Sequence, residues 1–568
     1  MSDDLKAVSR RSFLGQAGAA AVAAGVAAAA APVAEAQGTV NSPIGKVSSS
    51  GRVQQQYTLR VTDAINDALV GIPPHTTNGD EQRYADKSGS YSKGLLQASL
   101  GVVDPNAWQS FKQALNSGRQ SDWNAVITGG PRTQNGPQGA YRYYLEGADA
   151  ALFGNAPAPA FQEGLAVVPP APAVASAAYG TELIENYWGA LLRDVAFTDY
   201  PTNALANAAA AEMSAQPSYA GPRDGGGNVT PQLLFRGGYP GETAGPYISQ
   251  FFITPTGLGS QPISQQLQAF TPGVEFMTDE ASFQQVQNGI PTGQTLSFDP
   301  QNRYGYNGRM LAAYTHVDVL FQAYFTALLV MGAAGMPPNP GSPYVGNRTQ
   351  NGFSSFGGPD FASTLGAVAN IALSSVWYQK WLVHLRHRPE SGGGLVQLLL
   401  TGRGNQVQAH PAANVLNSQA VQRVFSRFGT YLLPQAFPEG SPTHPAYPTG
   451  HGAVAGACIT VLKFFFDGNH VIQNPVVPAP DGLSLQPYSG SDAGQITVNG
   501  ELNKLAHNVS FGHGIHAGIH WRSDTDSSIQ LGEAIALSVL QDRAHTYHEP
   551  FRIQIQKVDG TYATISNP

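Results

Sequence analysis

Apolar residues recur at helical spacing in several long segments of the chain. The first has its apolar positions at Leu183, Ile184, Tyr187, Trp188, Leu191 and Leu192. Residues 310–331 and 361–388 repeat the pattern, and an apolar run follows at 453–466. Because a repeat near 3.6 residues is the signature of a helix packed on one side, these segments predict a mainly α-helical fold.

The segment 310–331 is apolar enough to raise the question of a membrane span. It contains His316, Asp318 and Gln322, and polar groups of this kind are costly within a bilayer. We therefore expect a buried core helix. Gly- and Pro-rich stretches separate the helical segments at 153–177, 216–245, 337–359 and 476–500, and such composition predicts long surface loops.

Composition narrows the function classes. The chain has 568 residues, which is enough for more than one domain, and a net charge of −7 with only 12% charged residues. An acidic balance without a basic run argues against nucleic-acid binding. Cys458 is the single cysteine, so an intrachain disulfide is excluded and the fold must rely on packing.

Residues 1–36 have the features of an export signal. Arg10 and Arg11 form a twin-arginine pair, an Ala/Gly/Val-rich stretch follows, and Ala34-Glu35-Ala36 is a small-residue cleavage site. We expect a twin-arginine signal peptide and a mature chain that starts near Gln37 and is periplasmic or secreted. An uncleaved anchor is the alternative.

Residues 444–466 are the first candidate for chemistry. A loop carries His444 and His451, and Thr449 and Gly450 stand where a helix would begin. Free N–H groups at that helix N-terminus would face an oxyanion such as phosphate or vanadate. His451 would then be placed for proton transfer. An ordinary capped helix is the alternative.

Two further segments carry clustered cationic and imidazole groups. Lys380, His384 and Arg388 fall at i, i+4 and i+8, which predicts one stripe on a helix ended by Pro389. Their long arms could close over an anion, although a solvated face near a helix C-terminus is the alternative. Downstream, the histidines fall at i, i+3 and i+7, with an aspartate positioned to accept a ring proton: His513, His516, His520 and Asp524. Three imidazoles on one helix face could instead bind zinc, or simply pack in the core.

Together the three segments resemble the vanadium-dependent haloperoxidases, in particular the bromoperoxidases of algal and cyanobacterial type. The likeness rests on WYQKWLVH…RPE with seven residues between its Lys and Arg, on HPAYPTGH and on GIHWRSD, which here span 377–390, 444–451 and 518–524. Stretches from Asn78 and Tyr187 extend it over most of the chain after about residue 55. The resemblance implies two packed helix bundles, 37–305 and 306–568, with the site in the second.

The resemblance also implies residue roles around a vanadate cofactor. His520 would coordinate vanadium, while Lys380, Arg388, Thr449 and the Gly450 N–H would hold its equatorial oxygens. His451 would be the catalytic acid–base group. His444 would assist it beside the halide pocket, which Trp377 also lines.

Two positions depart from the family's pattern. Thr449 stands where the family usually has Ser, which keeps the hydroxyl but adds a methyl group. The family also places an Arg six residues before the vanadate histidine, and that position here is Gly514. The segment 511–520 is one residue longer than the family's, so His513 is expected to stand in for the Arg, with a charge that depends on pH.

The implied reaction oxidises bromide or iodide with hydrogen peroxide to a hypohalous acid, with the metal as Lewis acid. The product would halogenate small organic acceptors, and a homodimer is expected. Two alternatives stay open. One is a phosphatase-like hydrolase of the same fold, with His520 as nucleophile and His451 as acid. The other is a non-catalytic oxyanion-binding protein.

Overall fold

The computed structural model describes residues 75–142, 168–544 and 546–567. The expected signal peptide at 1–36 lies outside the described residues, as does most of the expected loop at 153–177. The described part is mainly α-helical, as predicted, and its strands form only two-stranded antiparallel sheets.

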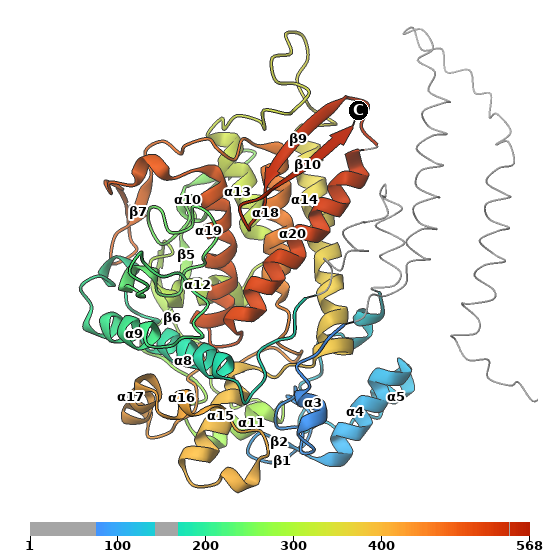
Figure 1. Cartoon of the computed structure of the whole chain (residues 1–568), viewed down its shortest axis with the longest axis vertical. Coiled ribbons are helices and arrows are strands. Elements are labelled where there is room, and N and C mark those ends of the chain that lie inside the picture. The colour runs from blue at the N-terminus through green and yellow to red at the C-terminus, as the bar shows by residue number, and fades with distance from the viewer. Residues whose placement is uncertain (1–74, 143–167, 545, 568) are drawn as a thin grey trace, which may run out of the picture.

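Four long helices form the central bundle (Figure 1): α14 (Gly358–Tyr378), α18 (Gly450–Phe465), α19 (Val498–Phe511) and α20 (Arg522–Ala544). Every residue of α18 is buried, because it lies between α14, α19 and α20. This explains why its sequence is apolar on all faces rather than on one stripe. The predicted helix after His451 is confirmed.

The crossing of α18 and α20 depends on glycines. A Cβ atom on Gly456 would lie 2.0 Å from the carbonyl oxygen of Ile529, and one on Gly532 would lie 1.9 Å from that of Ala453. Only residues without a side chain allow backbones this close. The N-terminal half of α20 therefore lies along the N-terminal half of α18, and the Thr449 N–H donates to Ser528 Oγ at 2.7 Å.

A second group of helices packs beside one end of this bundle. It contains α8 (Ala177–Leu192), α9 (Ala204–Ser214), α15 (Pro389–Leu400), α16 (Ala413–Leu416) and α17 (Gln419–Phe428). The helix expected at 183–192 is confirmed within α8, which begins where the Ser176 hydroxyl accepts from the Tyr179 N–H.

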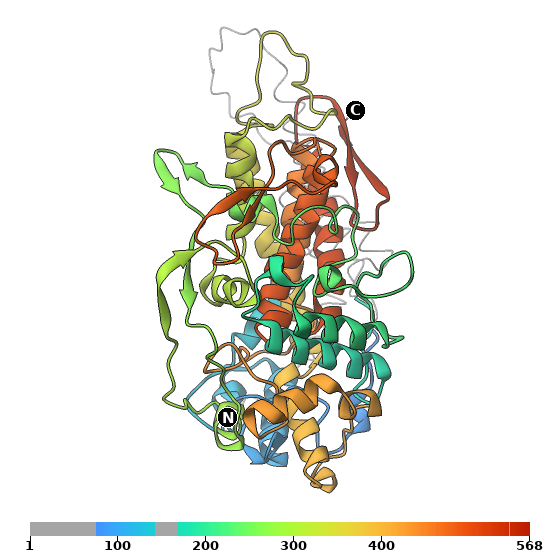
Figure 2. The same ribbon diagram turned by 90° about the vertical axis from the view of Figure 1, so that its left-hand side faces the viewer.

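Shorter elements complete the described fold. The helices are α3 (Asp80–Arg83), α4 (Pro105–Ser117), α5 (Gln120–Asn124), α10 (Gln250–Ile253) and α11 (Glu280–Gln287). The antiparallel strand pairs are β1–β2 (Gln97–Ser99, Val102–Val103), β3–β4 (Thr256–Leu258, Gln261–Ile263), β5–β6 (Leu267–Phe270, Phe298–Arg303), β7–β8 (Val476–Pro478, Leu485–Pro487) and β9–β10 (Phe551–Gln556, Tyr562–Asn567); α11 lies between β5 and β6. The two strand pairs within 256–303 project from one side of the bundle (Figure 2).

The single helix expected over 310–331 is two helices. α12 (Gly308–Val317) and α13 (Gln322–Ala333) meet at an angle of 106°, and Asp318 takes an extended backbone conformation at the break. In the described residues no single helix is long and apolar enough to cross a membrane. Only when α12 and α13 are counted together across their bend do they reach the length and apolar composition of a membrane span.

The helix expected to continue to Arg388 also ends early. α14 stops at Tyr378, a π turn follows at Gln379–His384, and Leu385 has a left-handed backbone with φ 44°. Pro389 then starts α15, a position that its fixed φ suits. The predicted stripe of Lys380, His384 and Arg388 on one helix is therefore wrong.

The main hydrophobic core joins the two halves of the chain. Tyr187 and Trp188 belong to the same buried cluster as Val454 and Val509. The boundary expected between residues 305 and 306 stays a prediction.

Candidate active site

The first turn of α18 provides donors without acceptors. Thr449 is the N-cap residue, but its hydroxyl makes no capping bond, and Oγ1 is buried without a partner among the residues that the structure describes. Among the described residues no acceptor faces the N–H groups of Gly450, His451 or Gly452. Such a helix start carries a partial positive charge and favours a bound anion.

Lys380 and Arg388 reach this point although they do not share a helix. The Lys380 ammonium donates to the carbonyls of Pro445 and Ala446, both at 2.8 Å, and Arg388 Nε donates to the carbonyl of His444 at 3.0 Å. Both side chains are buried. The π turn and the left-handed Leu385 reverse the chain direction. As a result, Lys380 and Arg388 come from different elements and both bind the loop that leads into α18.

One ring nitrogen of His520 is unprotonated and acts as an acceptor. Its Nδ1 lies 2.8 Å from Asp524 Oδ2, and its Nε2 lies 2.7 Å from Arg388 Nη1. Because a guanidinium can only donate, Nε2 must accept and Nδ1 must carry the proton that Asp524 takes. This is the tautomer that a metal-binding imidazole needs. The predicted pairing of His520 with Asp524 is present.

The site has an excess of positive charge. Every hydrogen-bond partner of Lys380 and Arg388 among the described residues is a carbonyl oxygen or an imidazole ring. Burial, and then mutual repulsion with Arg388, hold the pKa of Lys380 well below its usual value, and burial lowers the pKa of Arg388 to about 10. A bound anion would relieve both effects.

The neighbouring imidazoles respond to the same charges. Burial and the nearby Arg388 and Lys380 hold the pKa of His444 and of His520 well below the ordinary value. For His513 the direction is the same, through burial and then His451 and His520. Burial and the neighbouring charges therefore favour the neutral form of all three rings.

His513 lies inside this cluster, as the resemblance led us to expect. Its ring stacks on His451 with the centroids 3.9 Å apart and lies 5.4 Å from the ring of His520. Its Nδ1 is buried and has no hydrogen-bond partner in the described part of the chain. Residues Gly512–His516 form a π turn, which accommodates one residue more than an α turn. The extra residue of the segment is absorbed there, and His513, not Gly514, faces the cluster.

His516 points elsewhere, so the predicted common face of the three histidines is wrong. Its Nε2 lies 3.2 Å from the Tyr247 hydroxyl, and its ring packs against Phe197 and Phe235. Because of the π turn and the non-helical residues before α20, the rings of His513, His516 and His520 do not all point in the same direction. Within the described ranges no group of three or more His, Cys, Asp or Glu could hold a metal ion, which leaves the zinc alternative unsupported.

His451 has a carboxylate partner that the sequence reading missed. Its Nε2 lies 3.1 and 3.2 Å from the two oxygens of Asp318, which is placed by the break between α12 and α13. The sequence offered one indication of this partner, because Asp318 is a charged residue within the largely apolar segment 310–331. Since Nε2–H is directed at Asp318, Nδ1 is the nitrogen left to exchange a proton with a ligand.

Trp377 and His444 form one wall of the cluster. Their ring centroids are 4.8 Å apart, and Trp377 Nε1 donates to the Gly136 carbonyl at 2.9 Å. His384, by contrast, packs edge-on against Tyr447, and burial lowers its pKa to about 3. His384 therefore contributes packing and not charge.

Arg386 is a second residue that the sequence reading missed. Its Nη1 donates to Asp524 Oδ1 at 2.7 Å and its Nη2 to Glu182 Oε2 at 2.9 Å. The guanidinium also stacks over the Trp521 ring at 4.7 Å. Arg386 thus fixes the carboxylate that orients His520, and its place between His384 and Arg388 in the sequence gave no sign of this.

Comparisons with known proteins agree with this geometry. Residues 361–549 match the family model described as the VCPO second helical-bundle domain. The chain is 32% identical over 589 aligned residues to a vanadium-dependent bromoperoxidase of Corallina officinalis, covering 90% of this chain and 98% of that protein. It is 33% identical to a vanadium-dependent bromoperoxidase of Ascophyllum nodosum, covering 84% and 86%.

One solved structure matches over nearly the whole chain. It is titled the homohexameric structure of the second vanadate-dependent bromoperoxidase from Ascophyllum nodosum. The TM-score is 0.83 at 27% identity, and the match covers 91% of this chain and 90% of that one.

Proposed function

Because this chain belongs to the family of vanadium-dependent bromoperoxidases, we propose that it oxidises bromide or iodide with hydrogen peroxide and thereby halogenates small organic acceptors. The observation that carries the proposal is the pair of buried cations, Lys380 and Arg388, beside an α18 N-terminus with free donors. The comparisons give no support to the hydrolase or binding-only alternatives.

The residues present fit a vanadate ion. Thr449 Oγ1 and His513 Nδ1 are buried polar atoms that lack partners within the described ranges, and an oxyanion offers the oxygens that such groups need. Lys380, Arg388 and the Gly450 N–H would hold its oxygens, and His520 Nε2 would supply a nitrogen ligand. The methyl group of Thr449 leaves its hydroxyl available, so this departure from Ser keeps the donor.

When bound, vanadate supplies a Lewis-acid centre at which hydrogen peroxide becomes reactive toward halide. The protein's part is to hold charge and move protons. Asp524, fixed by Arg386, keeps the proton of His520 on Nδ1 and so keeps Nε2 available. Arg388 donates to that nitrogen in this structure and would donate to the anion instead.

His451 is the group placed to transfer protons. Asp318 orients its ring through Nε2 and stabilises the imidazolium that forms when Nδ1 takes a proton. The proton on Nδ1 can later return to a product oxygen. Asp318 therefore acts on the chemistry through His451, as a positioning residue.

His444 and Trp377 would face the incoming halide. Their tilted, contacting rings give a polarizable, partly apolar surface beside the cationic Arg388, which donates to His444 Nδ1 at 2.9 Å. A large, weakly hydrated anion such as bromide or iodide suits such a surface better than a strongly hydrated one.

The direct test is halogenation of a phenol indicator by purified protein with hydrogen peroxide and bromide, before and after incubation with orthovanadate. We expect turnover that needs vanadate and is lost with excess phosphate, which competes for the same donors. Absence of turnover in vanadate-loaded protein would contradict the proposal.

The His451→Ala variant separates binding from chemistry. We expect vanadate to remain bound, because its holders are other residues, while bromide oxidation falls by about 10²–10⁴-fold, the usual contribution of a positioned acid–base group. Wild-type turnover in this variant would disprove the role of His451.

We also propose export by the twin-arginine route, on the strength of Arg10 and Arg11 and the cleavage-type sequence at 34–36. Conversion of both arginines to lysine should retain the protein in the cytoplasm of an expressing bacterium. The measurement is fractionation followed by immunoblotting.

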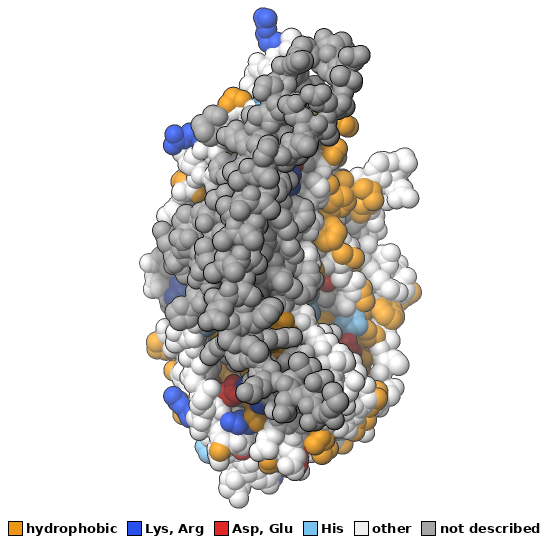
Figure 3. Space-filling model, turned by 90° about the vertical axis from the view of Figure 1, so that its right-hand side faces the viewer, with side chains coloured by type: hydrophobic (Ala, Val, Ile, Leu, Met, Phe, Trp, Pro, Cys, Tyr) orange, Lys and Arg blue, Asp and Glu red, His pale blue; other side chains and the backbone are white. Residues whose placement is uncertain are grey.

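Self-association is the last part of the proposal, with a homodimer as the expected form. Val317 and Val319 are 81% and 57% exposed, and hydrophobic side chains gather along one edge of the face in Figure 3. Such exposure supports an interface. Light scattering on the purified protein measures the mass directly, and a monomer at all concentrations would refute the proposal.

A further inference from the structure

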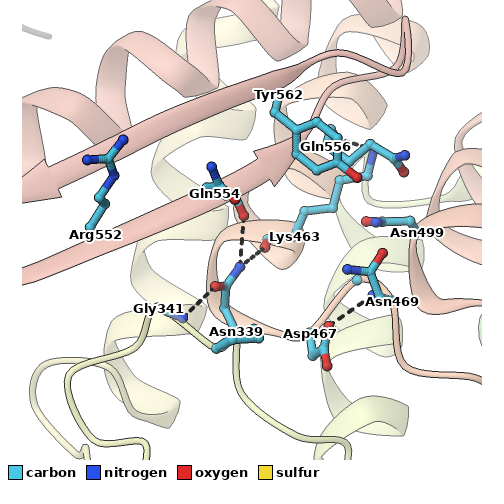
Figure 4. A pocket seen from close by; sticks show the side chains of 12 residues that line it. Asn339, Gly341, Lys463, Asp467, Asn469, Asn499, Arg552, Gln554, Gln556 and Tyr562 are labelled. Atoms are coloured by element: carbon cyan, nitrogen blue, oxygen red, sulfur yellow. Dashed lines mark hydrogen bonds between the residues drawn. The ribbon is translucent and has the colours of Figure 1, made fainter.

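Four lysines are buried among the residues that the structure describes: Lys93, Lys380, Lys463 and Lys504. Lys380 belongs to the candidate active site. Lys463 lies on α18, beside a polar groove in which Asn339 donates to the carbonyls of Lys463 and Gln554 (Figure 4). Lys504 pairs with Glu501 near the start of α19. Lys93, by contrast, binds a loop that leads directly to the active site.

Lys93 forms an ion pair with Glu390 in the protein interior. Lys93 Nζ lies 2.7 Å from Glu390 Oε1, and the two side chains are 1% and 0% exposed. Gln287 Nε2 donates to the same oxygen at 3.0 Å. Glu390 lies in the first turn of α15, two residues after Arg388. The pair is therefore attached to the segment that carries one cation of the active site.

The same pair holds the loop that leads to His444. Lys93 donates to the Ser441 carbonyl at 2.6 Å, and Glu390 Oε2 accepts from the Ser441 N–H at 2.7 Å. Both backbone groups of Ser441 are thus bonded by one ion pair. Gly440 has φ 60°, and a Cβ atom there would lie 2.3 Å from Glu390 Oε2. Only glycine allows the loop to approach the carboxylate this closely.

Two short stretches of chain connect this pair to the active site. Ser441 lies three positions before His444, and Glu390 lies two positions after Arg388. At the other end of both stretches, Arg388 Nε donates to the His444 carbonyl at 3.0 Å, and Nη2 lies 2.9 Å from His444 Nδ1. Because both stretches are short and are joined at both ends, the bond between Ser441 and Glu390 limits where the His444 ring can lie relative to Arg388.

The strength of this attachment depends on charge. Burial lowers the pKa of Lys93 to about 8, against the attraction of Glu390. Burial also opposes the charge on Glu390, but Lys93 and the Ser441 N–H outweigh it and lower the pKa of that carboxyl. Each member therefore favours the charged form of the other at pH 7. Hydrogen bonds to charged groups are about twice as strong as neutral ones, so a neutral side chain at position 390 would hold Ser441 less firmly.

We propose that the Lys93–Glu390 pair positions His444 and thereby sets the affinity of the enzyme for halide. Both residues act through His444 and are positioning residues. The inference rests on the proposed function, in which His444 and Trp377 face the incoming halide. Vanadate binding depends on the pair much less, because Lys380 and the first turn of α18 hold the anion from other elements.

The first test is Glu390→Gln, which keeps the shape of the side chain and removes its charge. In vanadate-loaded protein we expect the KM for bromide to rise about ten-fold while kcat stays within about two-fold, because a loss of ground-state binding raises KM alone. The dissociation constant of vanadate, measured by calorimetry, should stay at the wild-type value. An unchanged KM for bromide in the folded variant would overturn the proposal, as would a vanadate affinity that falls as far as the KM rises.

Glu501→Gln is the matched control for the loss of a buried carboxylate. Glu501 is 1% exposed, pairs with Lys504 and accepts from the Gln250 N–H at 2.6 Å, so its surroundings are like those of Glu390. We expect both variants to have a lower melting temperature than the wild type, but only Glu390→Gln to have a higher KM for bromide. An equal rise of KM in both variants would indicate general loosening of the fold and overturn the proposal.

Two further measurements cover poor folding of the single variant and failure of the proposed function. The double variant Lys93→Met/Glu390→Met removes both charges together, which proteins tolerate better than one unpaired buried charge, and it should raise the KM for bromide as the single variant does. Crystal structures of the wild type and of either variant should differ by on the order of 1 Å in the position of the His444 ring, a displacement large enough to alter function. An unmoved ring would overturn this inference, whereas absence of turnover in the vanadate-loaded wild type would refute the proposed function.

Discussion

Replacing His513 by arginine tests the most distinctive feature of the active site. The imidazole of His513 lies 3.9 Å from that of His451 and 5.4 Å from that of His520, so it faces the place where the anion's oxygens would lie. In the family that this chain resembles, an arginine serves there. We expect His513→Arg to bind vanadate about ten-fold more tightly than the wild type.

The magnitude follows from two opposing contributions. A charged hydrogen bond is worth about 1.5–3 kcal/mol, and the guanidinium adds at least one to the anion. The substitution also removes the stacked pair of imidazoles, at a cost of about 0.5–1.5 kcal/mol. The difference is on the order of 1.5 kcal/mol, or roughly ten-fold in the dissociation constant.

The assay is calorimetric titration of vanadate-free protein with orthovanadate at constant pH, with the melting temperature of each variant as the check on folding. His513→Gln, which keeps a donor but cannot be charged, is the matched control and should bind more weakly than the wild type. If folded His513→Arg binds no more tightly and His513→Gln binds equally well, His513 does not hold the anion.

Three further predictions concern the structure around the site. Arg386→Met leaves Glu182 and Asp524 buried without their cation and should lower the free energy of unfolding by about 3–5 kcal/mol; an unchanged denaturant midpoint would contradict this. His507 lies buried between Glu242 and Asp526, and although burial opposes the charge, the two carboxylates raise its pKa to about 9. Its contribution, on the order of 3 kcal/mol, is complete below about pH 6.5 and lost as the pH rises to about 9, so His507→Gln should flatten the fall of stability in that window, and parallel curves would refute it. Gly532→Ala should cost about 1–3 kcal/mol by forcing α18 and α20 apart, and a melting temperature equal to the wild type's would show that the crossing is not close-packed.

The sequence predicted the helices and most of the members of the site, but not how these members meet. Lys380 and Arg388 were both identified, yet on one continuous helix, whereas a π turn and the left-handed Leu385 bring them together from two elements. Side-chain periodicity contains no sign of a left-handed residue that is not glycine. That conformation is imposed by the surrounding packing, and the same limit applies to the break at Asp318.

The hydrogen-bond partners of the predicted site residues were the hardest part of the site to predict from the sequence. Asp524 was found because it lies four positions after His520, within the reach of local spacing. Asp318 and Arg386 act on His451 and Asp524 from more than 130 positions away along the chain. Contacts of that range depend on how helices pack, which a single sequence does not specify.

The π turn at Gly512–His516 bears on how members of this family are recognised in genomes. A motif search that requires a cationic residue at a fixed distance before the metal-binding histidine would stop at Gly514 and discard this chain as inactive. The π turn accommodates the additional residue within one helical turn. The residues before it therefore keep their places in the structure, while their distance in sequence from the metal-binding histidine grows by one. Searches that allow one insertion between the two positions, and a histidine as well as an arginine, would recover such sequences and group them by the length of this turn.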